Sequence, residues 1–241
     1  MSKQIEVLNV PFDVLSMEEA VSRVISYMDT NGSHIICTPN PEIVMAAGSD
    51  RELMDILKAA DLVVPDGVGI VWALKKSGGV HVQRIAGYDL IQNVFAKIKS
   101  SDRSVYFFGG APGVAADAAR AMQKKHPGLK IVGTRNGYFT ERDEIKIIDE
   151  IKKAKPDLLL VGLGSPKQEK WMYNNLRLTG VKSAIGVGGS FDVMSGRIKR
   201  APKIFQRLGL EWFYRLIKQP VRFKRILKLP NFVFKVIFSL K

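Results

Sequence analysis

The sequence predicts an α/β fold in which a mostly parallel sheet is flanked by helices and followed by a basic, helical C-terminal appendage. Along residues 1–196, short apolar segments alternate with longer helical patterns, which is typical of strands joined by crossover helices. Most of these segments are continuously apolar, as in strands buried on both faces of a parallel sheet. Positive charge is concentrated beyond residue 196. We therefore expect a Rossmann-like domain over residues 1–196 and an appendage over residues 197–241.

Local signals place the elements along the chain. Ser16 and Glu19 form a capping-box pattern, and Asp50 is placed to cap a second helix. Strands are expected at residues 34–37, 62–65, 104–108, 130–132, 158–161 and 182–185. Helices are expected at residues 16–27, 50–60, 88–99, 114–125, 143–154 and 166–177.

Composition narrows the class of protein. The chain has 241 residues and a single cysteine, Cys37, so it cannot form an internal disulfide, and we expect a reducing compartment. The first residues lack the charged start and apolar core of a secretory leader. No apolar run reaches the roughly 18 residues that span a bilayer. These features predict a protein of the cytoplasm.

The charge of the chain is unevenly distributed. Residues 197–241 contain 13 Lys or Arg and one acidic residue, Glu211, whereas residues 1–196 carry a net charge of only +2. Eight of the 21 aromatic residues also lie in residues 197–241. Basic and aromatic residues together predict docking on an anionic membrane surface. Nucleic acid is the competing partner, but the apolar segment 226–240 argues against it.

A basic stripe runs along part of the appendage. Arg215, Lys218, Arg222 and Arg225 are spaced by three, four and three residues, which would align them on one face of a helix. Pro220 is expected to break or kink that helix, in which case the stripe becomes two adjoining basic faces.

The segments that follow the strands are the candidate ligand loops, because ligands of such sheets bind beyond the carboxyl ends of the strands. Glycine-rich loops lie at residues 108–113, 162–167 and 186–190. Each is explained equally well as a structural turn, but together they favour a nucleotide or sugar nucleotide. None matches G-x-G-x-x-G or a P-loop, so NAD is not expected.

Several polar residues stand in these loops. Asp66 follows a strand, where a general base would lie, and helix capping is its alternative role. Asp192 occupies the equivalent place after the loop 186–190, as a ribose contact or as a cap. Thr38 and Asn40 either orient a polar ligand or simply form a turn. Arg84 either holds a diphosphate or is a solvated surface group.

The sequence offers no metal site. It contains no Cys/His cluster and no D-x-D pattern, so we expect neither a metal nor a cofactor. The charge of a nucleotide leaving group would then be neutralised by Arg, Lys and backbone N–H groups. Gln168 begins the helix 166–177, at the positive end of the helix dipole.

Six motifs occur together in a fixed order: Thr38-Pro-Asn-Pro-Glu42, Ala60-Asp-Leu-Val-Val-Pro-Asp-Gly67, Arg84-Ile-Ala-Gly-Tyr-Asp89, Phe108-Gly-Gly, Gly162-Leu-Gly-Ser-Pro-Lys-Gln-Glu169 and Gly186-Val-Gly-Gly-Ser-Phe-Asp192. With residues 195–202 and 209–215, this set resembles the WecG/TagA/CpsF family of glycosyltransferases, and the resemblance extends over essentially the whole chain.

The resemblance implies an inverting, metal-independent hexosyltransferase. It would move N-acetylmannosamine from UDP-N-acetylmannosamine to the 4-hydroxyl of N-acetylglucosamine on undecaprenyl diphosphate, making the disaccharide lipid of the teichoic acid linkage unit. The expected location is the bacterial cytoplasm, peripheral on the inner face of the cell membrane. Relatives use other donors, such as UDP-N-acetylmannosaminuronate, so the donor sugar stays open.

The same resemblance assigns roles to residues. Asp66 would be the catalytic base, and the appendage would complete the active site at the membrane. The residues implied in substrate binding are Thr38, Asn40, Arg84, Gln168, Gly188, Gly189, Asp192, Arg215, Arg222 and Arg225. The last three arginines alternatively serve membrane adhesion alone. The apolar faces of the appendage also predict a homo-oligomer, such as a dimer.

Two other functions stay open at this stage. A nucleic-acid-binding α/β protein would leave the glycine loops and Asp66 without a role. A non-catalytic membrane protein that binds a nucleotide sugar would bind UDP without turnover, and its binding would be indifferent to Asp66→Asn.

Overall fold

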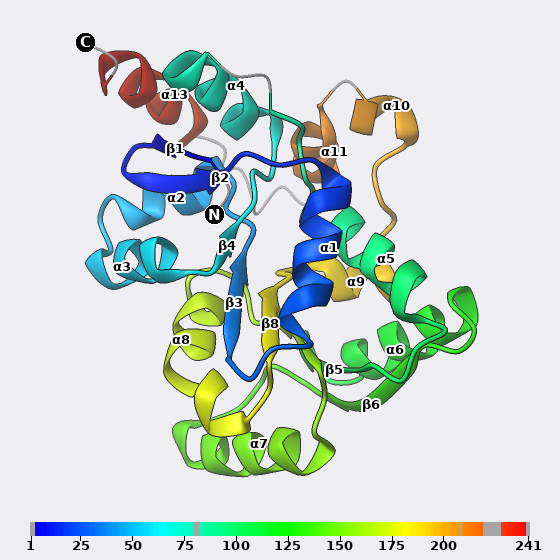
Figure 1. Ribbon diagram of the computed structural model, residues 1–241. Coiled ribbons are helices and arrows are strands. Elements are labelled where there is room, and N and C mark those ends of the chain that lie inside the picture. The colour runs from blue at the N-terminus through cyan, green and yellow to red at the C-terminus, as the bar shows by residue number, and fades with distance from the viewer. Residues whose placement is uncertain (1–2, 80–81, 208, 219–227, 240–241) are drawn as a thin grey trace.

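A six-stranded parallel sheet forms the centre of the protein (Figure 1). The computed structural model describes residues 3–79, 82–207, 209–218 and 228–239. The strand order is β4 (Leu62–Val63), β3 (His34–Cys37), β8 (Ser183–Gly186), β7 (Leu158–Gly162), β5 (Ser104–Gly109) and β6 (Lys130–Arg135). Every neighbouring pair is parallel, which confirms the predicted α/β class.

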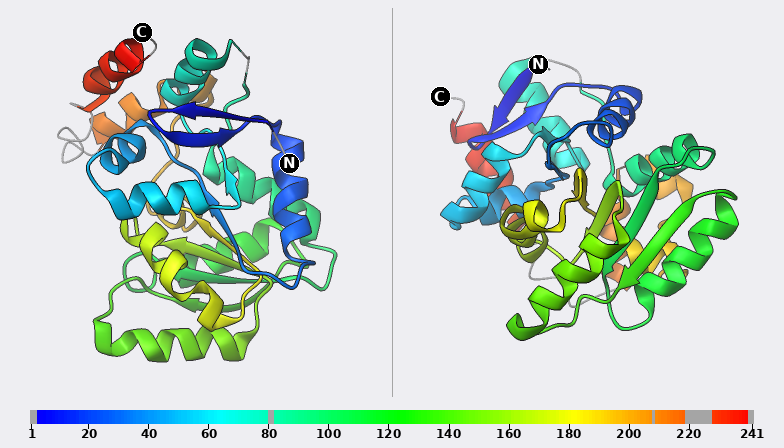
Figure 2. Two further views of the ribbon diagram at one scale, coloured as in Figure 1. Left: turned by 60° about the vertical axis from the view of Figure 1, so that its left-hand side comes forward. Right: turned by 60° about the horizontal axis from the view of Figure 1, so that its bottom comes forward.

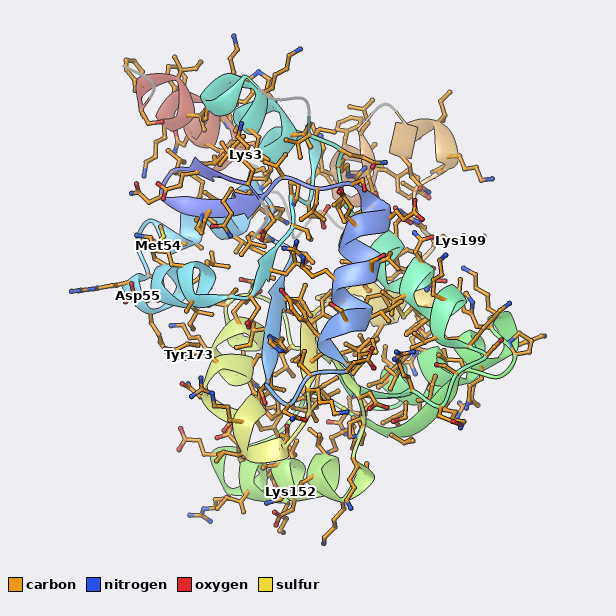
Figure 3. All side chains as sticks on the ribbon, in the orientation of Figure 1. Lys3, Met54, Asp55, Lys152, Tyr173 and Lys199 are labelled. Atoms are coloured by element: carbon orange, nitrogen blue, oxygen red, sulfur yellow. The ribbon has the colours of Figure 1, made fainter. Side chains whose placement is uncertain are left out.

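Helices cover both faces of the sheet (Figure 2). Residues Val105 and Phe107 of β5 pack toward α1 (Met17–Tyr27), α5 (Gly87–Ile98) and α6 (Val114–Lys125). The alternate residues Tyr106 and Phe108 pack toward α7 (Glu141–Ala154) and α8 (Lys167–Thr179). This alternation is why a central strand is apolar throughout. The outer faces of the helices carry charged side chains, such as Lys152 (Figure 3).

The edge strand β6 departs from this pattern. It extends to Arg135, three residues beyond the predicted end, and none of its six residues is buried. A strand at the edge of a sheet has one neighbour and less cover, so its sequence need not be continuously apolar. The prediction was that most of the strands, not all of them, are continuously apolar and buried on both faces, and β6 is the exception.

Several elements were not expected from the sequence. An antiparallel hairpin of β1 (Gln4–Val7) and β2 (Val10–Asp13) forms a second sheet, and Leu8 and Asn9 make its two-residue turn with φ of 49° and 67°. The other unexpected elements are α2 (Pro41–Ala47), α4 (Val68–Gly78) and α9 (Ser190–Met194). Asp50 caps α3 (Arg51–Ala59) through a bond from the Leu53 amide, as predicted.

Residues 197–241 contain α10 (Lys203–Arg207), α11 (Glu211–Lys218) and α13 (Lys228–Ser239). Phe232 and Val236 of α13 are buried in one cluster with residues of the hairpin, α2 and α4. Phe234 and Phe238, on the other side of α13, are 61% and 63% exposed. Pro220 and its predicted helix break lie outside the described residues. Within the described part of the chain, no helix is both long enough and apolar enough to cross a bilayer.

Candidate active site

A cavity of about 600 Å³ lies at the carboxyl ends of β3, β4, β7 and β8, with residues of α11 and α13 lining its other side. This is the edge at which parallel sheets bind their ligands. Seven of the residues predicted from the sequence line this one cavity: Thr38, Asn40, Asp66, Arg84, Gln168, Gly188 and Gly189.

Asp66 lies three residues beyond the end of β4. Its amide donates to the carbonyl of Pro39 at 3.4 Å, which ties the ends of β3 and β4 together. Gly67, with φ of 92°, turns the chain into α4 and is the N-cap of that helix, without a side-chain capping bond. The N-cap position of α4 is therefore held by Gly67 and not by Asp66. Oδ1 of Asp66 lies 3.9 Å from Nε of Arg84 and forms an ion pair with it.

Thr38 and Asn40 have structural partners in addition to their place at the cavity. The Thr38 hydroxyl donates to the carbonyl of Gly186 at 3.3 Å, which joins the ends of β3 and β8. Asn40 is the N-cap of α2, because its Oδ1 accepts from the Ile43 amide at 3.1 Å. The group that Asn40 can offer a ligand is thus its amide Nδ2.

Gln168 is buried at the floor of the cavity, and its orientation is fixed from both sides. Its Oε1 accepts from the Gly188 amide at 3.0 Å, and its Nε2 donates to Oε1 of Glu169 at 2.9 Å. Gly186 leaves the space for this side chain, since a Cβ there would lie 2.6 Å from the Gln168 Nε2. Burial raises the pKa of Glu169, and its Oε2 has no hydrogen-bond partner among the residues that the structure describes.

Arg84 belongs to a network of charged groups. Its Nη2 donates to Oε2 of Glu211 at 2.9 Å. Nε of Arg200 lies 3.7 Å from the other oxygen of Glu211, and both terminal nitrogens of Arg200 donate to Asp89, at 2.6 and 2.7 Å. The guanidinium of Arg200 also lies over the ring of Tyr88, 4.6 Å from its centroid. The network thus joins α11 to the loop before α5.

Arg200 and Glu211 also line the cavity, and no role was predicted for either of them from the sequence. The signal for Glu211 was present, because it is the one acid of a strongly basic segment. The described residues that line the cavity include three acids, Glu42, Asp66 and Glu211, and two bases.

The predicted C-terminal arginines are only partly placed. Arg215 lies in α11, and its side chain is outside what the structure describes. Arg222 and Arg225 lie outside the described residues altogether. Their predicted contacts with diphosphates remain predictions.

Other candidates from the sequence lie elsewhere. Asp192 is in the first turn of α9 and is not among the cavity residues. The loop 109–113 does not line the cavity either, and its glycines serve packing: a Cβ on Gly109 would lie 2.3 Å from the carbonyl oxygen of Gly162. The loops 162–167 and 186–190 both contribute to the cavity. No group of three or more His, Cys, Asp or Glu suited to a metal occurs within the described ranges.

Residues 5–241 match the Glycosyl transferase WecG/TagA/CpsF family. The chain belongs to this family. The predicted resemblance is therefore confirmed over nearly the full sequence, and the cavity is the candidate active site of a glycosyltransferase.

Named relatives narrow the comparison within the family. The chain is 38% identical over 212 residues to the N-acetylglucosaminyldiphosphoundecaprenol N-acetyl-beta-D-mannosaminyltransferase of Bacillus spizizenii, which covers 88% of this chain and 82% of the relative. It is 37% identical to the protein of the same name from Bacillus subtilis, with the same coverage. The Staphylococcus aureus protein of that name is 32% identical over 236 residues, covering 97% of this chain and 92% of the relative.

Proposed function

We propose that the protein transfers N-acetylmannosamine from UDP-N-acetylmannosamine to the 4-hydroxyl of N-acetylglucosamine carried on undecaprenyl diphosphate. The product would be the disaccharide lipid of the teichoic acid linkage unit. The names of the relatives support the acceptor and the sugar. The observation that carries the proposal is the Asp66 carboxylate, which lies at the ligand edge of the sheet, inside the cavity and paired with Arg84.

Asp66 is the proposed general base. It takes the proton of the acceptor 4-hydroxyl while that oxygen attacks the anomeric carbon, and UDP leaves from the opposite face, so the configuration inverts. Arg84 contacts the diphosphate of the donor and offsets the charge that develops on it. The buried amide of Gln168, together with Thr38 and Asn40, holds the sugar. No metal or cofactor enters this mechanism.

The loop with Gly188 and Gly189 holds the nucleotide. A Cβ at Gly188 would meet nothing within 4 Å, so this part of the loop is open to the cavity. Asp192 contacts the ribose from the turn that follows. Because the described lining carries more acids than bases, the basic appendage supplies the rest of the charge through Arg215, Arg222 and Arg225.

The appendage docks on the inner face of the cell membrane, where the lipid acceptor resides. Exposed aromatic side chains on α11 and α13, among them Trp212, Phe213, Phe234 and Phe238, form its apolar contact. The net charge of +12 over residues 197–241 is ample for an anionic surface at about 1 kcal/mol per basic residue. A truncation after Gly196 should abolish binding to anionic vesicles. In the absence of lipid, the same apolar faces mediate self-association of the protein into an oligomer. Light scattering with and without detergent tests this.

The activity is tested by UDP release from UDP-N-acetylmannosamine, with and without the diphosphate-linked acceptor, in EDTA. Acceptor-dependent release that survives EDTA supports the proposal. Asp66→Asn should remove most turnover, by roughly a hundredfold or more, and leave UDP binding intact. The matched control is Asp55→Asn, the same change at an exposed position of α3. Release at the normal rate in Asp66→Asn would reject Asp66 as the base, and release only with UDP-N-acetylmannosaminuronate would reject the donor.

A further inference from the structure

Glu211 is the single acidic residue of residues 197–241, and it is buried, with 7% of its side chain exposed. A carboxylate is costly to bury unless it is paired and hydrogen-bonded. All other charged residues of this segment are basic. The position of the segment around Glu211 therefore depends on the groups that pair with this buried acid.

The partners of Glu211 belong to different parts of the chain. Arg84 comes from the loop before α5 and donates Nη2 to Glu211 at 2.9 Å. Arg200 comes from the segment before α10, is held by two bonds to Asp89, and places its Nε 3.7 Å from Glu211. Glu211 is thus placed between two guanidinium groups, one of which is itself anchored to α5.

We propose that Glu211 is a positioning residue for Arg84, through which the seating of α11 is coupled to the binding of the donor diphosphate. This inference rests on the proposed function, in which Arg84 contacts that diphosphate. Glu211 accepts a hydrogen bond from the guanidinium at 2.9 Å, whereas Oδ1 of Asp66 lies 3.9 Å from its Nε. Arg84 is therefore held close to the proposed base, Asp66, without forming a short hydrogen bond to it at the Nε contact.

The physical reason lies in the length of the arginine side chain. An arginine loses much conformational freedom when it is fixed, and the free energy of fixing it is otherwise drawn from substrate binding. In the folded protein, Glu211 fixes Arg84 before the substrate arrives. Without that carboxylate, the guanidinium would turn toward Asp66, whose Oδ1 already lies 3.9 Å from its Nε. Donor binding would then have to break this new pair.

The test is a double-mutant cycle on UDP affinity, measured by calorimetry on the full-length protein. The proteins are the wild type, Glu211→Gln, Arg84→Ala and the double variant. Because a charge-assisted hydrogen bond is lost, Glu211→Gln should weaken UDP binding roughly tenfold. In the Arg84→Ala background the same change should have no further effect, since Glu211 acts through Arg84. Additive losses in the double variant would overturn the inference.

Two further proteins keep the outcome clear. Glu150→Gln breaks another arginine–glutamate pair, Arg135 to Glu150 at 3.2 Å, on the far strand β6 and helix α7, and should leave UDP affinity unchanged. Limited proteolysis tests whether Glu211→Gln makes α11 and α13 more susceptible to cleavage. If it does, Glu211→Asp, which keeps the negative charge, takes the place of Glu211→Gln in the cycle. An unchanged affinity in Arg84→Ala would instead reject the proposed contact of Arg84 with the diphosphate, which is a failure of the proposed function.

Discussion

The attachment of α13 to the rest of the protein should depend on Phe232. This side chain is 1% exposed and packs in one cluster with residues of α2 and α4. Removing a buried phenylalanine ring costs about 3–5 kcal/mol. Phe232→Ala should therefore raise the population in which α13 is detached by between about a hundredfold and a few thousandfold.

Hydrogen exchange of the α13 amides measures this population, because a detached helix of 12 residues is only marginally stable in water. The matched control is Phe234→Ala, which makes the same change two residues along the same helix at a position that is 61% exposed. It should leave the exchange of α13 nearly unchanged. Equal exchange in Phe232→Ala and the wild type, or equal acceleration in both variants, would refute the packing argument.

Three further predictions concern stability, each measured by denaturant unfolding. Burial raises the pKa of Glu169, so the folded wild-type protein loses stability as the pH rises through that pKa. The stability of Glu169→Gln relative to wild type should therefore increase from pH 4 to pH 8, and a difference that does not change with pH would contradict this. Gly109→Ala should cost about 3 kcal/mol or more, since its Cβ would lie 2.3 Å from a backbone oxygen of β7, whereas Gly180→Ala, also at positive φ but with open space, should cost about 1–2 kcal/mol. Ser16→Ala should cost about 1 kcal/mol by removing the capping box of α1, and Ser26→Ala in the same helix less than about 0.5 kcal/mol.

The sheet was predictable because strands that are buried on both faces are continuously apolar, and such runs are easily recognised in the sequence. β3 has the predicted bounds, and the other five strands overlap their predicted ranges. The hairpin was missed because its turn uses Leu8 and Asn9, not the glycine that usually marks two positive φ values. Helix α4 was missed because it is apolar on much of its surface, and this gives it little of the periodicity by which a helix is recognised.

The candidate site was predictable to the extent that the loops after the strands define it. Asp66, Thr38 and Gln168 follow three different strands and meet in one cavity, as the parallel sheet requires. Local patterns could not show that Asn40 both caps α2 and lines the cavity, since the second role depends on segments that are far apart in the chain. Nor could they pair Arg84 with Glu211, 127 residues later in the chain, because that contact exists only once α11 is seated.

The charge of the appendage therefore has two separable parts. Among its 13 basic residues, Arg200 helps to fix the segment through Asp89 and Glu211, whereas a uniformly basic surface by itself would bind any anionic partner. Its one acid, Glu211, pairs with the guanidinium groups of Arg84 and Arg200 beside the candidate base, and these contacts fix the position of α11. Neutralising several of the lysines should weaken membrane binding in proportion to the charge removed, whereas neutralising Glu211 alone should act on the donor site. Different responses of membrane affinity and donor affinity to these two changes would show that docking and donor binding depend on different residues of the same segment.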